Sequence, residues 1–324
     1  MSSAPPSKNL QVVDQHDEVI QWLMDGDPAI RWQIMRDLLD RPMQEWTTEQ
    51  ARTVDTGWGA RLLAHQAVDG IWGGGIYSPK WTSSTYTLLM LRTIGIPRTY
   101  PAAQQGTQLV LNNLLGETCD AAFYQKLALC DRCIVGMMLQ LAVYFMLDDA
   151  RIEALVENLL SERMPDGAWN CRRARRPRPH HSSFHTTFNV LEGLREYIEA
   201  GDGAQRNAAL AAEQGALELM LQHHLFKSDH TGHIIDSKFT RLSFPYRWHY
   251  DVLRGLAYFA RAQWPRDSRL QDAIELLHER RGKDHRWPVQ QKYSGKVFFE
   301  MEPVGGPSRW NTLRALRVLR WWGE

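Results

Sequence analysis

The sequence predicts an all-α fold built from about six helical hairpins, and three observations lead to this prediction. The first is a weak internal repeat of helical segments with an apolar-x-x-apolar pattern. The second is an amphipathic stretch between successive segments of this kind. The third is that no long stretch alternates apolar and polar residues as a half-buried β-strand does.

The repeat is anchored on one apolar residue in each segment. Successive anchors are separated by 51 to 62 residues, which leaves room for two helices and two connections in each unit. The anchors are Met35, Leu88, Leu139, Leu191, Leu253 and Leu313.

Partner helices are predicted between the anchored ones, because apolar residues recur there at three- and four-residue spacing. A first short helix around 17–25 completes six pairs. The polar, Pro-rich residues 1–16 are expected to form a disordered arm, and residues 17–324 a single domain. The predicted partner helices are 58–67, 105–115, 150–162, 206–225 and 268–281.

Composition excludes several classes of function. The formal net charge is +1, so the overall charge favours neither nucleic acid nor an anionic membrane as a partner. No run of eighteen apolar residues occurs, so no transmembrane segment is expected. The 4 Cys are too few for a disulfide scaffold in a chain of 324 residues, so reduced thiols and a cytoplasmic location are expected.

The 13 Trp are unusually many, and several follow a recurrent turn. The turn reads Gln66-Ala-Val-Asp69-Gly70-Ile-Trp72, then Pro165-Asp166-Gly167-Ala-Trp169, then Asp284-His-Arg-Trp287. Asp-Gly favours a tight turn because Gly allows a positive φ and Asp bonds its own backbone. The Trp that follows is expected to pack between adjacent hairpins rather than to take part in chemistry.

These Gln-x-x-Asp-Gly-x-Trp turns resemble the repeats of the squalene cyclase and protein prenyltransferase β-subunit superfamily. The resemblance covers nearly the whole chain from about residue 17. It implies an α/α toroid, in which parallel inner helices surround a central cavity and outer helices cover them. The length fits one barrel, as in a prenyltransferase β-subunit, and not the two of a complete squalene cyclase. The Asp-x-Asp-Asp acid motif of alkene-protonating cyclases is missing, and Asp148-Asp149 is its nearest substitute.

In such a ring the N-terminal ends of the inner helices lie on one side, where free N–H groups favour an anion. Basic and aromatic residues accumulate just before or at these ends, and aromatic faces can stabilise a carbocation. A substrate site is therefore predicted there. Its residues are Lys80, Trp81, Tyr86, Arg172, Arg173, Phe188, Arg247, Trp248, Arg309 and Trp310.

A zinc site is predicted from the phase of the repeat. Cys133 and His185 each stand six residues before their anchors, and Asp131 lies two residues before Cys133. Thiolate, imidazole and carboxylate form a suitable three-ligand set with one open position. Protein prenyltransferase β-subunits carry zinc on a similar Asp-x-Cys and a His in the next inner helix. Cys171 is an additional ligand or a replacement for Cys133, while Glu117-Thr118-Cys119 is a rival outside the repeat phase.

Acid–base candidates near the same ends are Asp251, His249, Tyr250 and His181, with Glu302 as a further acid. The resemblance implies an enzyme of terpenoid or prenyl chemistry (a transferase, cyclase or lyase) acting on an apolar, diphosphate-bearing substrate, with zinc. Two alternatives stay open: a metal-free terpenoid cyclase or isomerase, and a non-catalytic toroid that binds a lipid or a partner. Prenyltransferases need a second subunit, which this chain does not encode.

Overall fold

The computed structural model describes residues 18–171, 179–201 and 203–324, so the predicted arm over residues 1–16 lies outside the described residues. The described residues are helical, and outside the helices their backbone pairing is limited to isolated bridges. The elements in chain order are α1 (Glu18–Met24), α2 (Pro28–Asp37), α3 (Met43–Ala51), η1 (Arg52–Val54), α4 (Gly57–Leu63), α5 (Ser84–Ile94), α6 (Pro101–Leu115), α7 (Ala121–Leu129), α8 (Arg132–Tyr144), α9 (Arg151–Ser161), α10 (Phe184–Ala200), α11 (Arg206–Gln222), α12 (Val252–Arg261), η2 (Ser268–Leu270), α13 (Gln271–Glu279) and α14 (Arg309–Trp322).

The all-α prediction is confirmed, and each repeat anchor lies in a helix. We call α2, α5, α8, α10, α12 and α14 the anchor helices. The five Leu anchors are fully buried. Met35 is only partly buried, whereas its neighbour Ile34 is fully buried, so the inward face of α2 is shifted by one residue from the predicted phase.

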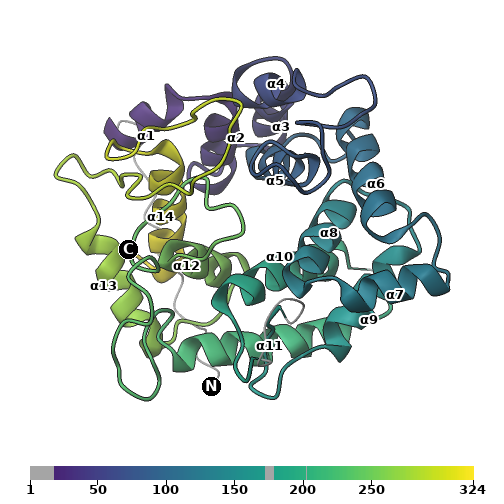
Figure 1. Ribbon diagram of the computed structural model, residues 1–324. Helices are drawn as coiled ribbons and strands as arrows, with labels where there is room; N and C mark the ends of the chain where they lie inside the picture. The colour runs from purple at the N-terminus through teal and green to yellow at the C-terminus, as the bar shows by residue number, and fades with distance from the viewer. Residues whose placement is uncertain (1–17, 172–178, 202) are drawn as a thin grey trace, which may run out of the picture.

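The anchor helices follow one another in space as they do in sequence. Packing joins α5 to α8, α8 to α10, α12 to α14, and α14 back to α2. Side-chain bonds supply the remaining links: Trp32 of α2 donates to the Ile94 carbonyl of α5, and Tyr258 of α12 donates to the Leu191 carbonyl of α10. The contacts therefore close on themselves. In Figure 1 the anchor helices surround the middle of the view, and α6, α7, α9, α11 and α13 lie outside them.

The Trp-bearing turns are built alike. The indole N–H of Trp72, Trp169 and Trp287 donates to a carbonyl ten residues earlier, at 2.9, 2.7 and 2.7 Å. All three side chains are fully buried. The position after each turn's Asp has a positive φ, with 82° and 100° at Gly and 61° at His285. The prediction that these Trp are packing residues agrees with their burial, since each satisfies its N–H within the fold.

Glycines allow α8 and α10 to cross closely. A Cβ atom added at Gly136 would lie 2.5 Å from the carbonyl oxygen of Asn189, and one added at Gly193 would clash with the Gly136 carbonyl oxygen. Real side chains do not fit at such distances. The crossing therefore requires glycine on both helices, and it fixes the spacing of the first turns that carry Cys133 and His185.

Charged side chains fill part of the space between the anchor helices. Glu196 of α10 forms ion pairs with Arg92 of α5 and with Arg261 of α12, the latter at 2.9 Å. Glu192, one turn earlier, pairs with Arg254 at 2.8 Å. Burial opposes the ionisation of Glu196, but the two guanidinium groups outweigh it and lower its pKa to about 2. The middle of the molecule is thus more polar than the apolar cavity that the resemblance implies.

Two helices were not predicted from the sequence. Helix α3 has no buried residue, and α7 buries only Phe123 and Leu127, so neither carries a clear apolar stripe. Helix α7 lies outside the anchor helices. Among the described residues, no helix combines the length and the apolar character needed to cross a membrane.

Candidate functional site

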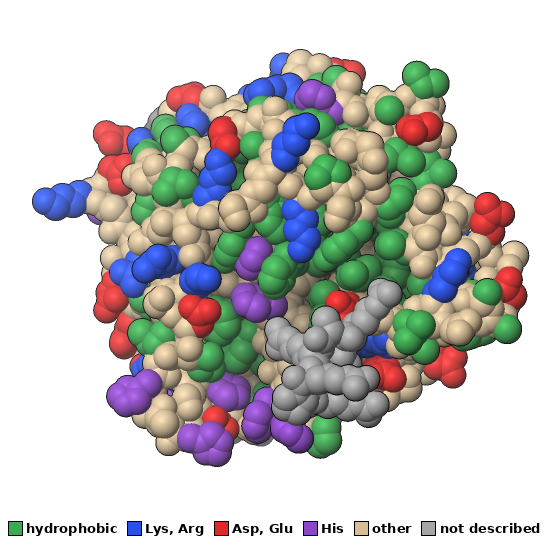
Figure 2. All heavy atoms as spheres, viewed as in Figure 1, with side chains coloured by type: hydrophobic (Ala, Val, Ile, Leu, Met, Phe, Trp, Pro, Cys, Tyr) green, Lys and Arg blue, Asp and Glu red, His purple; other side chains and the backbone are tan. Residues whose placement is uncertain are grey.

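Two adjoining pockets lie between the anchor helices and the loops that precede them. They enclose about 420 and 590 Å³ of empty space, part of which is open solvent. Figure 2 shows hydrophobic, cationic and histidine side chains gathered over the middle of this face. The residues that line both pockets are Tyr86, Met90, Phe244 and Arg247.

Three of the predicted substrate-binding residues, Trp81, Tyr86 and Arg247, line these pockets, and Lys80 and Trp248 lie beside them. Lys80 and Trp81 precede α5, Tyr86 is in its first turn, and Arg247 and Trp248 come from the segment before α12. The Lys80 ammonium lies 5.2 Å from the Trp248 ring centre, and the Arg247 guanidinium lies 5.5 Å from the Trp81 ring centre. The repeat thus brings together two loops from distant parts of the chain.

Arg247 is the cation that faces both pockets. No carboxylate lies within ion-pair distance of its guanidinium among the described residues. The Glu300 carboxylate acts on Arg247 electrostatically and raises its pKa, but that carboxylate is paired with Lys292. Burial lowers the pKa of Arg247 to about 10, so the side chain stays charged at neutral pH with its charge incompletely compensated.

Lys80 lies among four aromatic rings. Its ammonium is 5.4 Å from the Tyr77 ring centre, 5.6 Å from that of Trp81 and 6.0 Å from that of Tyr86, in addition to its contact with Trp248. Burial lowers the pKa of Lys80. The hydroxyls of Tyr77 and Tyr86 lie 3.0 Å apart, and burial raises the pKa of Tyr77 to about 12, so these phenols are neutral at physiological pH.

A loop between α13 and α14 holds Trp81 in place. The backbone N–H of Trp81 donates to the Lys296 carbonyl at 2.7 Å, and its indole N–H donates to the Ser294 carbonyl at 3.0 Å. Gly295 lies against the indole at a φ of 153°, and a Cβ atom there would clash with it. The sequence reasoning missed this loop because it has no helical periodicity. The sequence feature that could have indicated this loop is its content of aromatic residues and lysines, which include Tyr293, Phe298, Phe299, Lys292 and Lys296.

His249 is the predicted acid–base histidine nearest the site; it lines neither pocket but contacts Trp81 and Tyr293, which line the second one. Its ring stacks between Trp248 and Tyr293, with centroid distances of 3.8 and 3.4 Å. Burial, reinforced by nearby His185, Arg254 and Lys80, lowers the pKa of His249 to about 3. Its Nδ1 atom and the Trp248 Nε1 atom are buried, and neither has a hydrogen-bond partner among the described residues. His249 is therefore a neutral and weakly basic imidazole that is suited to hydrogen bonding.

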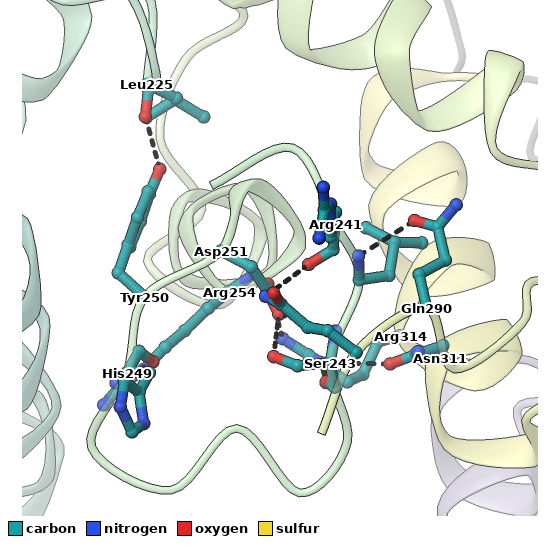
Figure 3. A network of polar contacts seen from close by, with 12 residues as sticks. Leu225, Arg241, Ser243, His249, Tyr250, Asp251, Arg254, Gln290, Asn311 and Arg314 are labelled. Atoms are coloured by element: carbon teal, nitrogen blue, oxygen red, sulfur yellow. Dashed lines mark hydrogen bonds and ion pairs between the residues drawn. The ribbon is translucent and has the colours of Figure 1, made fainter. Parts of the chain in front are cut away.

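Asp251 and Tyr250, also predicted as catalytic residues, are integrated into the fold (Figure 3). Asp251 is fully buried and caps α12 by accepting from the Arg254 N–H at 2.8 Å. Its other oxygen accepts from the Ser243 N–H and hydroxyl, at 2.9 and 2.5 Å. Tyr250 is fully buried and donates its hydroxyl to the Leu225 carbonyl. Neither residue lines the pockets.

The predicted metal ligands cluster in part. The Sγ atoms of Cys133 and Cys171 lie 3.1 Å apart, and Cys171 Sγ lies 3.3 Å from the Thr186 hydroxyl. The hydrogen bond between the two sulfur atoms lowers the pKa of Cys171 to about 7, while the same bond and burial raise that of Cys133. His185 Nδ1 accepts the Tyr250 N–H at 2.8 Å. Asp131 Oδ1 is buried and has no hydrogen-bond partner among the described residues.

The donor chemistry of these side chains suits zinc, because thiolate, imidazole and carboxylate are its usual protein ligands. Nevertheless, in the part of the chain that the structure describes, no three or more His, Cys, Asp or Glu side chains are grouped so as to hold a metal ion. Cys119, the rival metal ligand, is exposed. Asp149, from the pair nearest to the acid motif of the cyclases, is paired with Arg151. The zinc site therefore stays a prediction.

The remaining predicted residues lie apart from the pockets or outside the described part of the chain. Phe188 is buried against Tyr250, and Arg309 lies over the Trp22 ring of α1 at 4.5 Å. Trp310 packs behind the site, stacked on Phe244 at 4.9 Å. His181 is on an exposed loop. Arg172 and Arg173 lie outside the described residues.

Comparison with known proteins identifies no relative. No protein-family model matches the chain, and neither a curated protein nor a solved structure does so.

Proposed function

We propose that this protein is an α/α toroid that binds an apolar organic anion of the isoprenoid diphosphate class and converts it at the pocket between the anchor helices. The closed order of contacts from α2 to α14 supports the toroid. The repeated Trp turns, with matching indole bonds, support a common origin of the hairpins.

One observation carries the choice of ligand. The Arg247 guanidinium lines both pockets without an ion-paired carboxylate among the described residues, and Lys80 lies over the same Trp81 ring. Two cations that contact one indole favour an anion with several oxygens, such as a diphosphate. The surrounding rings and Met90 favour an apolar group attached to that anion.

These side chains fit the ionisation of an allylic diphosphate. The C–O bond breaks, its electron pair leaves with the diphosphate, and Arg247 and Lys80 stabilise the negative charge that forms. The faces of Trp81, Tyr86 and Trp248 stabilise the allylic cation. His249 is a weak base with a pKa of about 3, but it can accept the proton whose loss converts the cation to an alkene, because a carbocation is a far stronger acid.

Protonation of an alkene is less well supported. The three carboxylates that line the pockets are engaged: Glu192 with Arg254, Glu300 with Lys292, and Glu302 with the Ser308 hydroxyl and the first N–H groups of α14. Asp251 is a buried helix cap. Diphosphate ionisation needs no carboxylic acid.

Zinc is a separate part of the prediction. Asp131, Cys133, Cys171 and His185 would hold it, and the ion would supply a Lewis acid that activates a coordinated thiol or water. None of the steps above uses the ion. Metal analysis of the purified protein, and of its Cys133→Ala and His185→Ala variants, tests whether zinc is bound.

The direct test is incubation with prenyl diphosphates of several chain lengths and with squalene, followed by product analysis. We expect hydrocarbon or transfer products from at least one diphosphate and none from squalene. Conversion of squalene alone would instead favour the metal-free cyclase. Tight binding without any product would favour the non-catalytic alternative. The absence of both binding and product would refute the proposal.

A further inference from the structure

Cys133 and Cys171 form a pair of free thiols that the proposed reaction does not use. Their sulfur atoms lie 3.1 Å apart although the residues are 38 positions apart in the chain. Cys133 is in the first turn of α8, and Cys171 belongs to the segment that follows the second Trp turn. Both are partly buried.

The fold fixes both partners of this contact. Trp169, two residues before Cys171, is fully buried, and its indole and carbonyl are bound to Leu159 and Ser183. The Asn170 side chain donates to the His181 carbonyl at 2.7 Å. On the other side, the glycine crossing of α8 and α10 sets the position of Cys133. The sulfur–sulfur contact is therefore a consequence of rigid packing and not of a free loop.

A short approach is the main requirement for a disulfide. Bonded sulfur atoms lie about 2.05 Å apart, so closure requires an approach of roughly 1 Å from the present distance. A change of that size can be met by small side-chain rotations. The other two cysteines are separate cases, since Cys119 is exposed and Cys130 has its own contacts.

We propose that Cys133 and Cys171 are a dithiol–disulfide couple that exchanges with small disulfides such as oxidised glutathione. One protein thiolate attacks the glutathione disulfide and releases one glutathione thiol, which leaves a mixed disulfide on the protein. The second protein thiolate then attacks the protein sulfur of that mixed disulfide and releases the second glutathione thiol. In total, two protein thiols are oxidised to one disulfide and one glutathione disulfide is reduced to two thiols.

Oxidation would tie the start of α8 to the segment before α10, next to the aromatic pocket. Cys133 is close enough to Lys80 and Tyr86 to influence them electrostatically. The couple does not depend on the ligand proposed above, so the two proposals can fail separately.

The experiment equilibrates the full-length protein with glutathione buffers of increasing oxidised fraction, then quenches with acid, alkylates and maps peptides without reduction. We expect a linked Cys133–Cys171 peptide, a higher melting temperature than that of the reduced protein, and reversal of both by dithiothreitol. In Cys171→Ser we expect Cys133 to carry glutathione and the rise in melting temperature to be lost. Cys119→Ser, at an exposed position, is the control and should behave as the wild type does.

Two results would overturn the proposal, and both are read on the wild-type protein without any variant. One is recovery of Cys133 and Cys171 in separate peptides while Cys119 reacts with glutathione. The other is stoichiometric zinc in the purified protein that keeps both thiols unreactive until a chelator removes it, because the pair would then be a metal site.

Discussion

Lys80 and Arg247 place their positive charges against the same indole, 5.6 and 5.5 Å from the ring centre of Trp81. The two side chains come from loops before different anchor helices, and no carboxylate is ion-paired with either among the described residues. Because neither charge is paired in the described part of the chain, an anion bound beside this indole would be attracted by both. We take this relationship as the basis of the proposed ligand class.

The Trp turns are expected to be central to stability. Trp169→Phe removes a buried indole bond to the Leu159 carbonyl and leaves a cavity, which should lower the free energy of unfolding by about 2–4 kcal/mol. Chemical denaturation measures this. Trp321→Phe is a matched control, because Trp321 makes a similar indole bond, to the Trp264 carbonyl, but is only partly buried. Equal losses in the two variants would contradict the special role of the turn.

The crossing of α8 and α10 should tolerate no side chain at Gly136. Gly136→Ala places a methyl group 2.5 Å from the Asn189 carbonyl oxygen, so we expect a loss of about 2 kcal/mol or more in unfolding free energy. Gly306→Ala, in a loop where the nearest atom lies at 3.2 Å, serves as the comparison. A Gly136→Ala protein as stable as the wild type would show that the helices do not cross as closely as described.

Glu196 should couple stability to acid. Because its folded-state pKa is lowered from 4.5 to about 2, the unfolded state takes up the proton first. Its contribution is therefore present above about pH 4.5 and is lost as the pH falls toward 2. Glu196→Gln should cost about 3 kcal/mol near neutral pH, since it leaves the largely buried guanidinium group of Arg92 without its carboxylate partner. Urea unfolding at several pH values measures this loss. The control is Glu199→Gln, whose carboxylate is more exposed. Similar losses of stability in the two variants would contradict the role of Glu196.

His249 should also make the protein less stable in acid. Its pKa is lowered from 6.5 to about 3 by folding, so the unfolded state binds the proton first and acid favours unfolding between these values. The His249→Gln variant should show a shallower loss of stability over this range. The control is His181→Gln, at an exposed loop position. If both variants keep the wild-type pH profile, His249 is not buried as the structure indicates.

Much of the helical plan was predictable from the sequence, because burial imposes a period that the sequence must carry. The five Leu anchors are buried, and 206–225 and 150–162 correspond closely to α11 and α9. Helix α3 was missed because it buries nothing and so has no apolar stripe. The positive φ of His285, where the other turns have Gly, shows that the turn geometry persists when its usual residue is replaced.

The site was predictable only where repeat phase decides position. Lys80, Trp81 and Arg247 precede anchor helices, and the structure brings them together at one end. Arg309 has a similar phase but lies across α1, because Trp22 offers its guanidinium an aromatic face. Tyr293 reaches His249 from a loop without periodicity, and only tertiary packing determines that contact.

The most direct test of the proposed ligand is calorimetric titration of the wild-type protein and two Arg variants with farnesyl diphosphate and with farnesol, which has the same chain without the anion. We expect wild-type protein to prefer the diphosphate, and Arg247→Gln to weaken that binding roughly tenfold or more, about 1.4 kcal/mol. Arg309, also predicted from the sequence, begins α14 and points its side chain at Trp22 of α1, so Arg309→Gln should bind as the wild type does. Equal affinity for farnesol and the diphosphate, or equal effects of the two substitutions, would contradict the account.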